Sequence, residues 1–331
     1  MAPILVPNPR AFPGIRPPNP LRCRPEHLSL TPVTYLRIAN VFLTISAIAV
    51  AASVVLFITP GPRLSIEFAG GTLMEIRTAA DTQKQAVIDA LDAFTLKDGT
   101  RLDHSTVSST KGGTFLLRMR DMTNEDHLAL LTHLQSTLGN AEEMQFNAIG
   151  PTVGASLKTK SLLALGVASL AIILYLAFAF RNVPRRLNPW KFGILAVVAL
   201  IHDLLITSGI FTVLSRFTTF EYDTLFVTAL LTTLGYSVMD TIVIFDRIRD
   251  NINYQQRGET FEQLVTRSLK ESIIRTLSTG TTALFMLIAM FFFGASSIRW
   301  FMLALIVGTL IGTYSSFFVA TPLLIYWRKR D

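Results

Sequence analysis

One carboxylate stands inside a long apolar stretch of this chain. Asp240 lies within residues 226–245, a run that is otherwise apolar or hydroxylic. About 20 such residues are what an α-helix needs to cross a hydrocarbon core of roughly 30 Å, so the run predicts a membrane-spanning helix. An ionisable group in such a helix costs at least ~2.5 kcal/mol and marks ion or proton pathways. Asp240 is therefore a candidate proton carrier, the alternative being a polar lock between helices.

Hydroxyl side chains precede Asp240 at helical spacing. Residues three or four apart share one face of a helix, and stepping back from Asp240 gives Ser237, Tyr236, Thr233, Thr232 and Thr228. We expect this face to form a polar stripe that ends at the acid. We expect the other side to meet lipid or apolar neighbours, through Leu225, Leu230, Val238 and Ile242.

An arginine lies at a similar predicted depth in the next apolar stretch. Arg275 comes five residues after Lys270, and Asp240 five residues before Phe245, counted from ends that face the same side. Opposite charges at one depth can neutralise each other, directly or through water. The alternative is that Arg275 snorkels to the membrane surface. The Ser and Thr residues that follow Arg275 would extend the hydroxyl-rich path.

A third candidate is the dipeptide His202-Asp203, near the middle of another apolar run. Histidine titrates near neutrality, and burial raises the pKa of a carboxyl group, so the pair suits proton exchange. A satisfied polar pair that fixes helix packing is an equal alternative. The candidate relay thus comprises Asp240, Arg275, His202, Asp203, Tyr236, Ser237 and Thr233.

Six apolar runs supply the helices that must position these residues. They cover residues 38–59, 161–180, 192–214, 224–245, 272–293 and 300–326. The chain has 331 residues, 50% of them hydrophobic and only 16% charged, which predicts a polytopic α-helical membrane protein with six spans. The net charge of +7 does not indicate nucleic acid, because most basic residues flank the apolar runs.

The distribution of Lys and Arg predicts the orientation. Basic residues concentrate in the N-terminal segment, the second and fourth connections and the C-terminus, whereas the other two short connections hold only Arg216 and Arg299. Both termini are therefore expected in the cytoplasm. Residues 1–32 are rich in proline and predict a disordered cytoplasmic tail. Residues 33–60 form the first span, and 159–331 form spans two to six with their basic loops.

Residues 61–158, between the first two spans, predict a periplasmic α+β domain of ferredoxin-like type. Expected strands are 64–68, 72–78, 102–109, 114–120 and 145–149. Expected helices are 82–94 and one that Thr123 caps and that ends at Leu138, with Leu128, Leu131 and Leu134 turned inward. In the last span, Gly308, Gly312 and Ser316 have the spacing of close helix packing.

No soluble catalytic site is expected. The single Cys23 excludes an internal disulfide and a cysteine metal site. His104, His127 and His133 lack metal-ligand spacing and are interpreted as surface residues. The chain contains no HExxH, Walker or GxGxxG pattern, so we expect no enzyme, no cofactor and no metal.

Five motifs resemble the SecF branch of the SecD/SecF family of bacterial protein-export subunits. They occupy residues 67–72 (EFAGGT), 149–154 (IGPTVG), 202–207 (HDLLIT), 235–251 and 275–279 (RTLST), in family order. Glu67 stands where the family has Asp, and Met239 where Asn is common. The second change removes one possible partner of Asp240 but keeps the acid.

The resemblance implies a partner, SecD, with which such proteins form a twelve-helix assembly similar to resistance-nodulation-division transporters. It further implies association with the SecYEG channel and YajC in the inner membrane, and use of the proton-motive force to promote export of preproteins. Asp240 and Arg275 match family positions implicated in proton conduction. Two alternatives remain: a non-conducting scaffold that stabilises SecD, and half of a proton-coupled small-molecule exporter.

Overall fold

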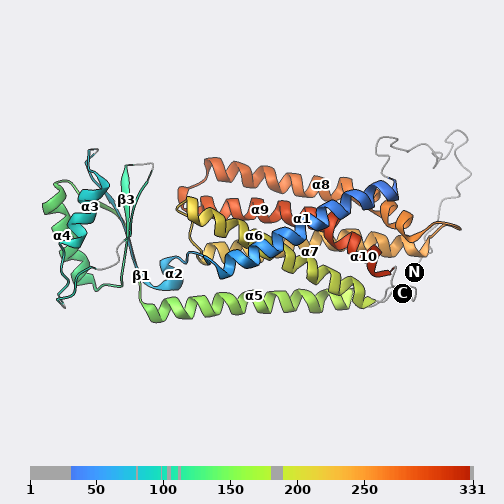
Figure 1. Ribbon diagram of the computed structural model, residues 1–331, viewed down its shortest axis with the longest axis horizontal. Helices are drawn as coiled ribbons and strands as arrows, with labels where there is room; N and C mark the ends of the chain where they lie inside the picture. Colours follow the sequence, from blue (N-terminus) through green and yellow to red (C-terminus); the bar gives the residue numbers. More distant parts are fainter. Residues whose placement is uncertain are drawn as a thin grey trace, which may run out of the picture.

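The computed structural model describes residues 31–79, 81–97, 99–102, 106–110, 113–179 and 189–328. The molecule is elongated, with a bundle of long helices at one end and a small α+β unit at the other (Figure 1). The predicted tail before residue 31, the basic loop at 180–188, Cys23 and His104 lie outside the described residues.

Six helical segments are long and apolar enough to cross a membrane, which confirms the predicted number within the part of the chain described. Five are single helices: α1 (Pro32–Ile58), α5 (Pro151–Ala179), α6 (Pro189–Phe217), α7 (Thr224–Asn253) and α8 (Phe261–Phe293). The sixth consists of α9 (Arg299–Ser315), a π-helical segment (Ser316–Ala320) and α10 (Thr321–Arg328), and the short 3-10 turn Ser296–Ile298 precedes it.

Several of the long helices begin at polar caps, which satisfy their first N–H groups. Asp223 caps α7 by accepting a hydrogen bond from Phe226 N, and Thr260 caps α8 in a reciprocal capping box with Gln263. Thr31 caps α1, in which Pro32 takes the first position.

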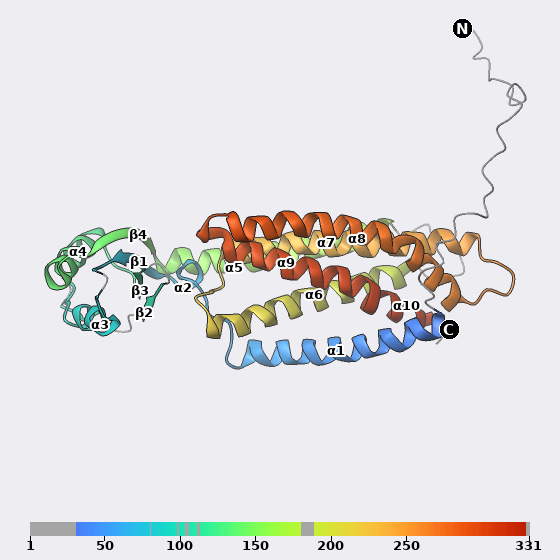
Figure 2. The same cartoon turned by 90° about the horizontal axis from the view of Figure 1, so that it is seen from above.

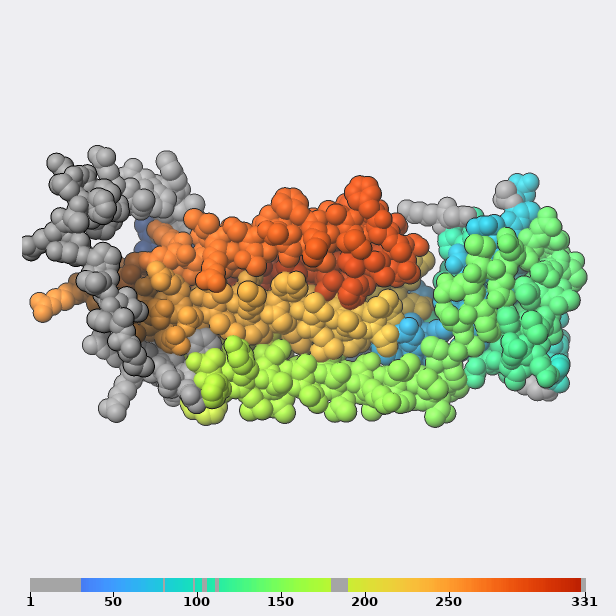
Figure 3. Space-filling model, turned by 180° about the vertical axis from the view of Figure 1, so that it is seen from behind, coloured from blue at the N-terminus to red at the C-terminus, as the bar shows by residue number. Residues whose placement is uncertain are grey.

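Helices α7 and α9 pack against each other within the bundle, α5 lies along one edge of it in Figure 1, and α1 lies along one edge in Figure 2. On one face α8, α7 and α5 run side by side (Figure 3). Apolar side chains of α5 such as Leu163 and Val167 are more than half exposed. Since lipid tails are as apolar as these side chains, such exposure is expected of a membrane-facing helix.

Small residues let α7 and α9 approach closely, as the spacing in the last span predicted. A Cβ atom added at Gly308 would lie 2.4 Å from Cγ2 of Thr233, and one at Gly312 would lie 2.9 Å from Cβ of Ser237. One turn further, the hydroxyls of Thr241 and Ser316 are 2.8 Å apart. The two helices therefore have a fixed alignment, which determines what Asp240 meets.

The α+β unit contains one four-stranded antiparallel sheet in the order β2-β3-β1-β4. Its elements are α2 (Ile66–Ala69), β1 (Gly71–Arg77), α3 (Lys84–Asp92), β2 (Thr106–Ser109), β3 (Thr114–Met119), α4 (Asn124–Leu138) and β4 (Glu142–Ile149). Helices α3 and α4 lie on one side of the sheet (Figure 1). Between them and the sheet lies a core that includes Met74, Ile76, Leu91, Leu117 and Leu130.

The prediction of a strand at residues 64–68 is wrong. Residues 66–69 form the short helix α2, because the Ser65 side chain accepts a hydrogen bond from Glu67 N and caps it. Leu64 pairs only in an isolated parallel bridge with Tyr222. Gly71 follows at φ 118°, where a Cβ atom would lie 2.7 Å from the carbonyl oxygen of Met119. Only glycine fits this approach without strain.

Two expectations about α4 are also wrong. Leu128 is 54% exposed, and Leu130 is the residue that packs inward with Leu134. His127 is buried rather than on the surface, with its ring stacked on Phe146 and Nε2 2.7 Å from Glu143. The inward face of α4 therefore follows His127, Leu130 and Leu134, which are spaced as i, i+3 and i+7.

The α+β unit is joined to the start of α7. Glu67 of α2 accepts hydrogen bonds from the backbone N and the hydroxyl of Thr224, at 2.8 and 2.6 Å. Arg118 of β3 forms an ion pair with Glu221, in the connection that precedes α7. The helix that carries Asp240 thus begins at the contact between the two parts of the molecule.

Candidate functional site in the membrane helices

Three helices converge on Asp203 of α6. Oδ1 lies 2.8 Å from Nδ1 of the adjacent His202, and both side chains are buried. Oδ2 accepts hydrogen bonds from the hydroxyls of Ser237 on α7 and of Ser315 on α9, the latter at 2.9 Å. A buried carboxylate requires such partners, because loss of its hydration costs several kcal/mol unless hydrogen bonds replace it.

The other ring nitrogen of His202 is not satisfied in this way. Nε2 is buried and has no hydrogen-bond partner among the described residues. His202 also lines a cavity of about 300 Å³ between α1 and α6, together with Leu43, Ser46 and Leu205 among others. The hydroxyl of Tyr314, whose ring centre is 6.1 Å from that of His202, contacts Ser46. His202 therefore connects the buried acid to the α1 side of the bundle.

Asp240 meets α9 rather than α8. Its Oδ2 accepts a hydrogen bond of 2.8 Å from Oγ1 of Thr313, and its side chain is partly buried. This contact follows from the close packing of Gly312 on Ser237, which brings the next residue of α9 level with Asp240.

The structure does not bring Arg275 to Asp240. Arg275 is exposed on α8, and no ion pair joins the two in the part of the chain described. Within the described residues, the Thr313 hydroxyl is therefore the hydrogen-bond partner of the Asp240 carboxylate. The hydroxyls of Thr279 and Thr282 donate to carbonyl groups one turn back in α8, so they do not extend a path between helices.

The expected polar stripe of α7 is divided between two environments. Ser237 and Thr233 are buried against α9, where Oγ1 of Thr233 donates to the carbonyl of Leu230. Tyr236 is 38% exposed and makes no side-chain hydrogen bond within the described residues. Leu230 and Val238, expected to meet lipid or apolar neighbours, are buried among apolar side chains of the bundle.

Thr313 and Ser315 are the partners that sequence reasoning missed. The tetrapeptide Thr313-Tyr314-Ser315-Ser316 interrupts an apolar span with four hydroxyl groups, and that interruption was the available signal. Its last residue, Ser316, is the first residue of the π-helical segment Ser316–Ala320. Such segments frequently occur at functional sites.

The two acids share α9 as the source of their hydroxyl partners. Asp203 and Asp240 bond to hydroxyls of α9 only two residues apart, Ser315 and Thr313. A hydroxyl group can both donate and accept, so it can hold either an ionised or a protonated carboxyl group. Among the described residues, no cluster of His, Cys, Asp and Glu could hold a metal ion.

Outside the spans, burial is the main cause of the raised pKa values of the acids in the connection between α6 and α7. Burial raises the pKa of Glu221, although Arg118 and Arg63 act in the opposite direction. Burial also raises the pKa of Asp223, with a smaller contribution from Glu67, and it raises the pKa of Tyr222 to about 12. These groups lie where the α+β unit meets the bundle.

The fold and site define a multi-pass membrane protein with an α+β unit between its first two spans and hydrogen-bonded acids within the bundle. The family model "Protein export membrane protein SecD/SecF, C-terminal" matches residues 129–330, and "SecD/SecF GG Motif" matches residues 55–81. The chain belongs to the SecD/SecF family.

Relatives and solved structures agree with this family. The chain is 38% identical to the protein translocase subunit SecF of Thermobaculum terrenum, over 88% of this chain and 92% of the relative. It is 33% identical to SecF of Synechocystis, with similar coverage. The crystal structure of SecDF from Thermus thermophilus aligns with a TM-score of 0.77 at 29% identity. That alignment covers 89% of this chain but 38% of the longer SecDF chain.

Proposed function

We propose that this chain works with SecD as a proton-driven accessory subunit of the Sec preprotein translocase in the bacterial inner membrane. The observation that carries the proposal is the pair of intramembrane acids, Asp203 and Asp240, which hydroxyls of α9 hold at the centre of the bundle. Such residues are costly within a membrane and are retained where protons or ions move.

Asp240 is the coupling group in this proposal. The ionised carboxylate accepts a hydrogen bond from Thr313, and protonation removes the charge without removing the hydroxyl partner. Two charge states favour two packings of α7 against its neighbours. Moving one charge across the membrane supplies ~2.3 kcal/mol per 100 mV, which is enough to shift such an equilibrium substantially.

His202 and Asp203 form the second station. Proton transfer between Nδ1 of His202 and Oδ1 of Asp203 needs no rearrangement, because the two atoms are 2.8 Å apart. Nε2 of His202, which has no partner among the described residues, is the position at which a proton would arrive or leave.

Arg275 and Tyr236 belong to the surface that meets SecD. Both are exposed in this chain, on α8 and α7, two helices that lie side by side on one face (Figure 3). The alignment with SecDF covers only 38% of the SecDF chain, which supports SecD as the neighbour of this surface. Arg275 would then balance charge within the assembled complex.

In this proposal the α+β unit is a periplasmic domain with a ferredoxin-like fold. The element order β-α-β-β-α-β and the strand order β2-β3-β1-β4 support this assignment. With both termini in the cytoplasm, the unit would face the preprotein as it leaves SecYEG. YajC completes the set of partners that family membership suggests.

The decisive experiment uses the complex co-purified with SecD and SecYEG and reconstituted in vesicles. Asp240→Asn keeps the size and the hydrogen-bonding capacity of the side chain but cannot titrate. It should insert and bind SecD normally and lose the part of export that depends on a pH gradient. Asp246→Asn is the matched control, because Asp246 lies on the same helix but its side chain is about half exposed and is paired with Arg249. Undiminished gradient dependence in Asp240→Asn would refute the proposal.

One observation favours the scaffold alternative for the second station. Asp203 has a hydrogen bond from each of three neighbours, as a structural lock between helices would. A scaffold subunit would retain gradient-dependent export in both Asp203→Asn and Asp240→Asn, provided that SecD still associates.

A further inference from the structure

A second cavity, with a polar lining, lies at the end of the bundle nearest the α+β unit. Its volume is about 660 Å³, and its lining residues are Arg63, Thr100, Arg101, Thr106, Arg118, Met119 and Arg120. Four of these residues are arginines, and no acidic side chain is among the described residues that line the cavity. Such a concentration of guanidinium groups indicates a site for an anion.

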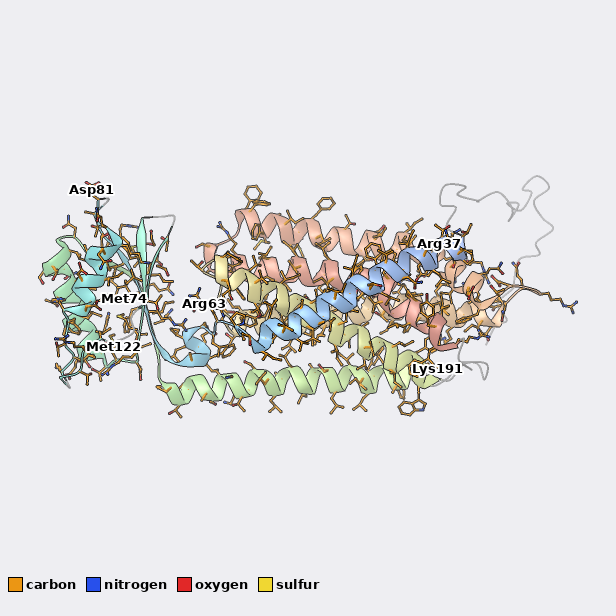
Figure 4. All side chains as sticks on the ribbon, in the orientation of Figure 1. Arg37, Arg63, Met74, Asp81, Met122 and Lys191 are labelled. Carbon is orange, nitrogen blue, oxygen red and sulfur yellow. The ribbon has the colours of Figure 1, made fainter. Side chains whose placement is uncertain are left out.

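The cavity lies at the height where the membrane helices end. Arg63 follows α1 and donates a hydrogen bond of 2.9 Å to the carbonyl of Ser215, in the last turn of α6. Figure 4 shows Arg63 between the sheet and the bundle. From the sheet, Arg118 donates to the carbonyl of Leu64, in the segment that follows α1. Lipid headgroups occupy this height, directly outside the hydrocarbon core.

Among the described residues that line the cavity, the charged side chains are all arginines. The acid beside it, Glu221, is shared by two arginines, at 2.5 Å from Arg118 and 3.9 Å from Arg63. Arg101 and Arg120 also line the cavity, and both are exposed. The planar guanidinium group binds phosphate through two parallel hydrogen bonds, which makes arginine the preferred residue for recognising a phosphate group.

Apolar side chains at the same end of the bundle favour a lipid over a soluble anion. Ile58, at the end of α1, is 77% exposed, and Phe217, at the end of α6, is 84% exposed. Two hydrogen bonds from Arg216 to the carbonyls of Pro60 and Gly61 hold these two helix ends together. A phospholipid supplies acyl chains for such a surface as well as a phosphate for the arginines, and aromatic side chains commonly lie at this membrane depth.

We propose that Arg63, Arg101, Arg118 and Arg120 bind the phosphate of an anionic phospholipid, such as phosphatidylglycerol, in the leaflet next to the α+β unit. This site is distinct from the intramembrane acids and does not depend on their role in proton transfer. A bound lipid would join the membrane surface to the contact between the sheet and the start of α7.

The test measures lipid retention by the full chain. The protein is reconstituted in phosphatidylcholine vesicles that contain a minor fraction of phosphatidylglycerol, then extracted gently, and the retained lipids are counted by native mass spectrometry. Arg101→Gln/Arg120→Gln removes two exposed charges of the cavity and leaves the contacts of Arg63 and Arg118 with Glu221 in place. Lys158→Gln/Lys160→Gln removes two exposed charges near the start of α5 and is the matched control.

Wild type and control should retain phosphatidylglycerol in preference to phosphatidylcholine, and the arginine variant should lose this preference. Its affinity for short-chain phosphatidylglycerol should fall about tenfold or more, since each charge-assisted hydrogen bond contributes that much. Equal retention by the arginine variant, or no preference in the wild type, would overturn the proposal. Tighter binding of inorganic phosphate would indicate a soluble anion instead, and tighter binding of an oligoglutamate peptide would indicate a protein partner. Melting curves that coincide for all three proteins exclude misfolding as the cause.

Discussion

Asp240 of α7 accepts a hydrogen bond from Thr313 of α9, a neutral partner on a helix that follows α7 by two spans. The opposite charge that sequence places at the same depth, Arg275, is exposed on α8. A neutral hydroxyl stabilises an ionised acid less than an arginine does, but it also fits the protonated acid. The Asp240 site can therefore change its charge while it keeps its hydrogen bond.

Thr313→Val should impair the protein through Asp240 alone. The substitution preserves the shape of the side chain and removes the hydroxyl group, so that the carboxylate loses its hydrogen-bond donor. Gradient-dependent export in reconstituted vesicles should fall, while membrane insertion stays normal. Thr313→Ser, which restores the hydroxyl, should restore export. Equal activity of the Val and Ser variants would show that this hydrogen bond has no role.

Two substitutions of Asp203 separate a relay from a lock. Asp203→Leu leaves the hydroxyl of Ser237 buried without an acceptor, at a cost of about 1–3 kcal/mol, whereas Ser315 can still donate to the carbonyl of Gly312; the variant should therefore have a lower melting temperature in detergent. Asp203→Asn keeps an acceptor oxygen and should melt close to wild type. If Asp203 relays protons, the Asn variant loses gradient-dependent export despite its stability; export at the wild-type level would identify Asp203 as a lock.

Gly308→Ala should destabilise the contact between α7 and α9. The added Cβ atom would lie 2.4 Å from Cγ2 of Thr233, closer than real contacts allow, so the helices must separate. Overpacking of this kind costs about 1–3 kcal/mol, measurable as a lower melting temperature. Gly166→Ala on α5 is the control, because a Cβ atom there meets nothing within 4 Å. There the higher helix propensity of alanine should leave stability unchanged or slightly raised.

Asp223 should make stability depend on pH. Burial raises the pKa of its carboxyl group in the folded protein. The resulting contribution to stability is complete below the ordinary pKa of 3.8 and is lost as pH rises through the raised value. Asp223→Asn retains a cap for α7 and removes this titration. The difference in melting temperature, variant minus wild type, should therefore increase with pH above 3.8; a constant difference would contradict the effect of burial.

A cysteine at Ser109 tests the proposed orientation. Ser109 is exposed at the end of β2, and Cys23→Ser removes the single native cysteine. In intact cells whose outer membrane has been made permeable, a membrane-impermeant thiol reagent should label the Ser109→Cys variant. The protein with only Cys23 should react after lysis alone. The reverse pattern would place both termini outside the cytoplasm.

The membrane helices could be predicted from sequence because apolar length alone specifies a span. The number of spans and the close packing at Gly308 and Gly312 followed from this pattern and from small-residue spacing. The strands of the α+β unit were predicted less well at 64–68, where Ser65 caps a helical turn that the apolar residues there do not indicate. Local capping overrode the apparent strand pattern.

The candidate site was predicted only in part, because helix rotation is not evident in one helix alone. Asp203 and Ser237 were both candidates, but their contact depends on how α6 and α7 are turned toward each other. Tyr236 precedes Ser237 by one residue and points to an exposed face instead. The partners Thr313 and Ser315 come from a span whose glycine spacing drew attention to packing and away from hydroxyl chemistry.

The contact between α7 and α9 has a second matching alignment one helical turn away. Shifting α7 by four residues, about 6 Å, would set Ser237 against Gly308 and Thr233 against Ala304, which are again small residues. Asp240 would leave Thr313 and come level with Thr309. The hydroxyl of Thr309 is buried and has no hydrogen-bond partner among the described residues. If the alignment of the two helices changed by one turn, the same carboxylate would therefore exchange one threonine partner for another.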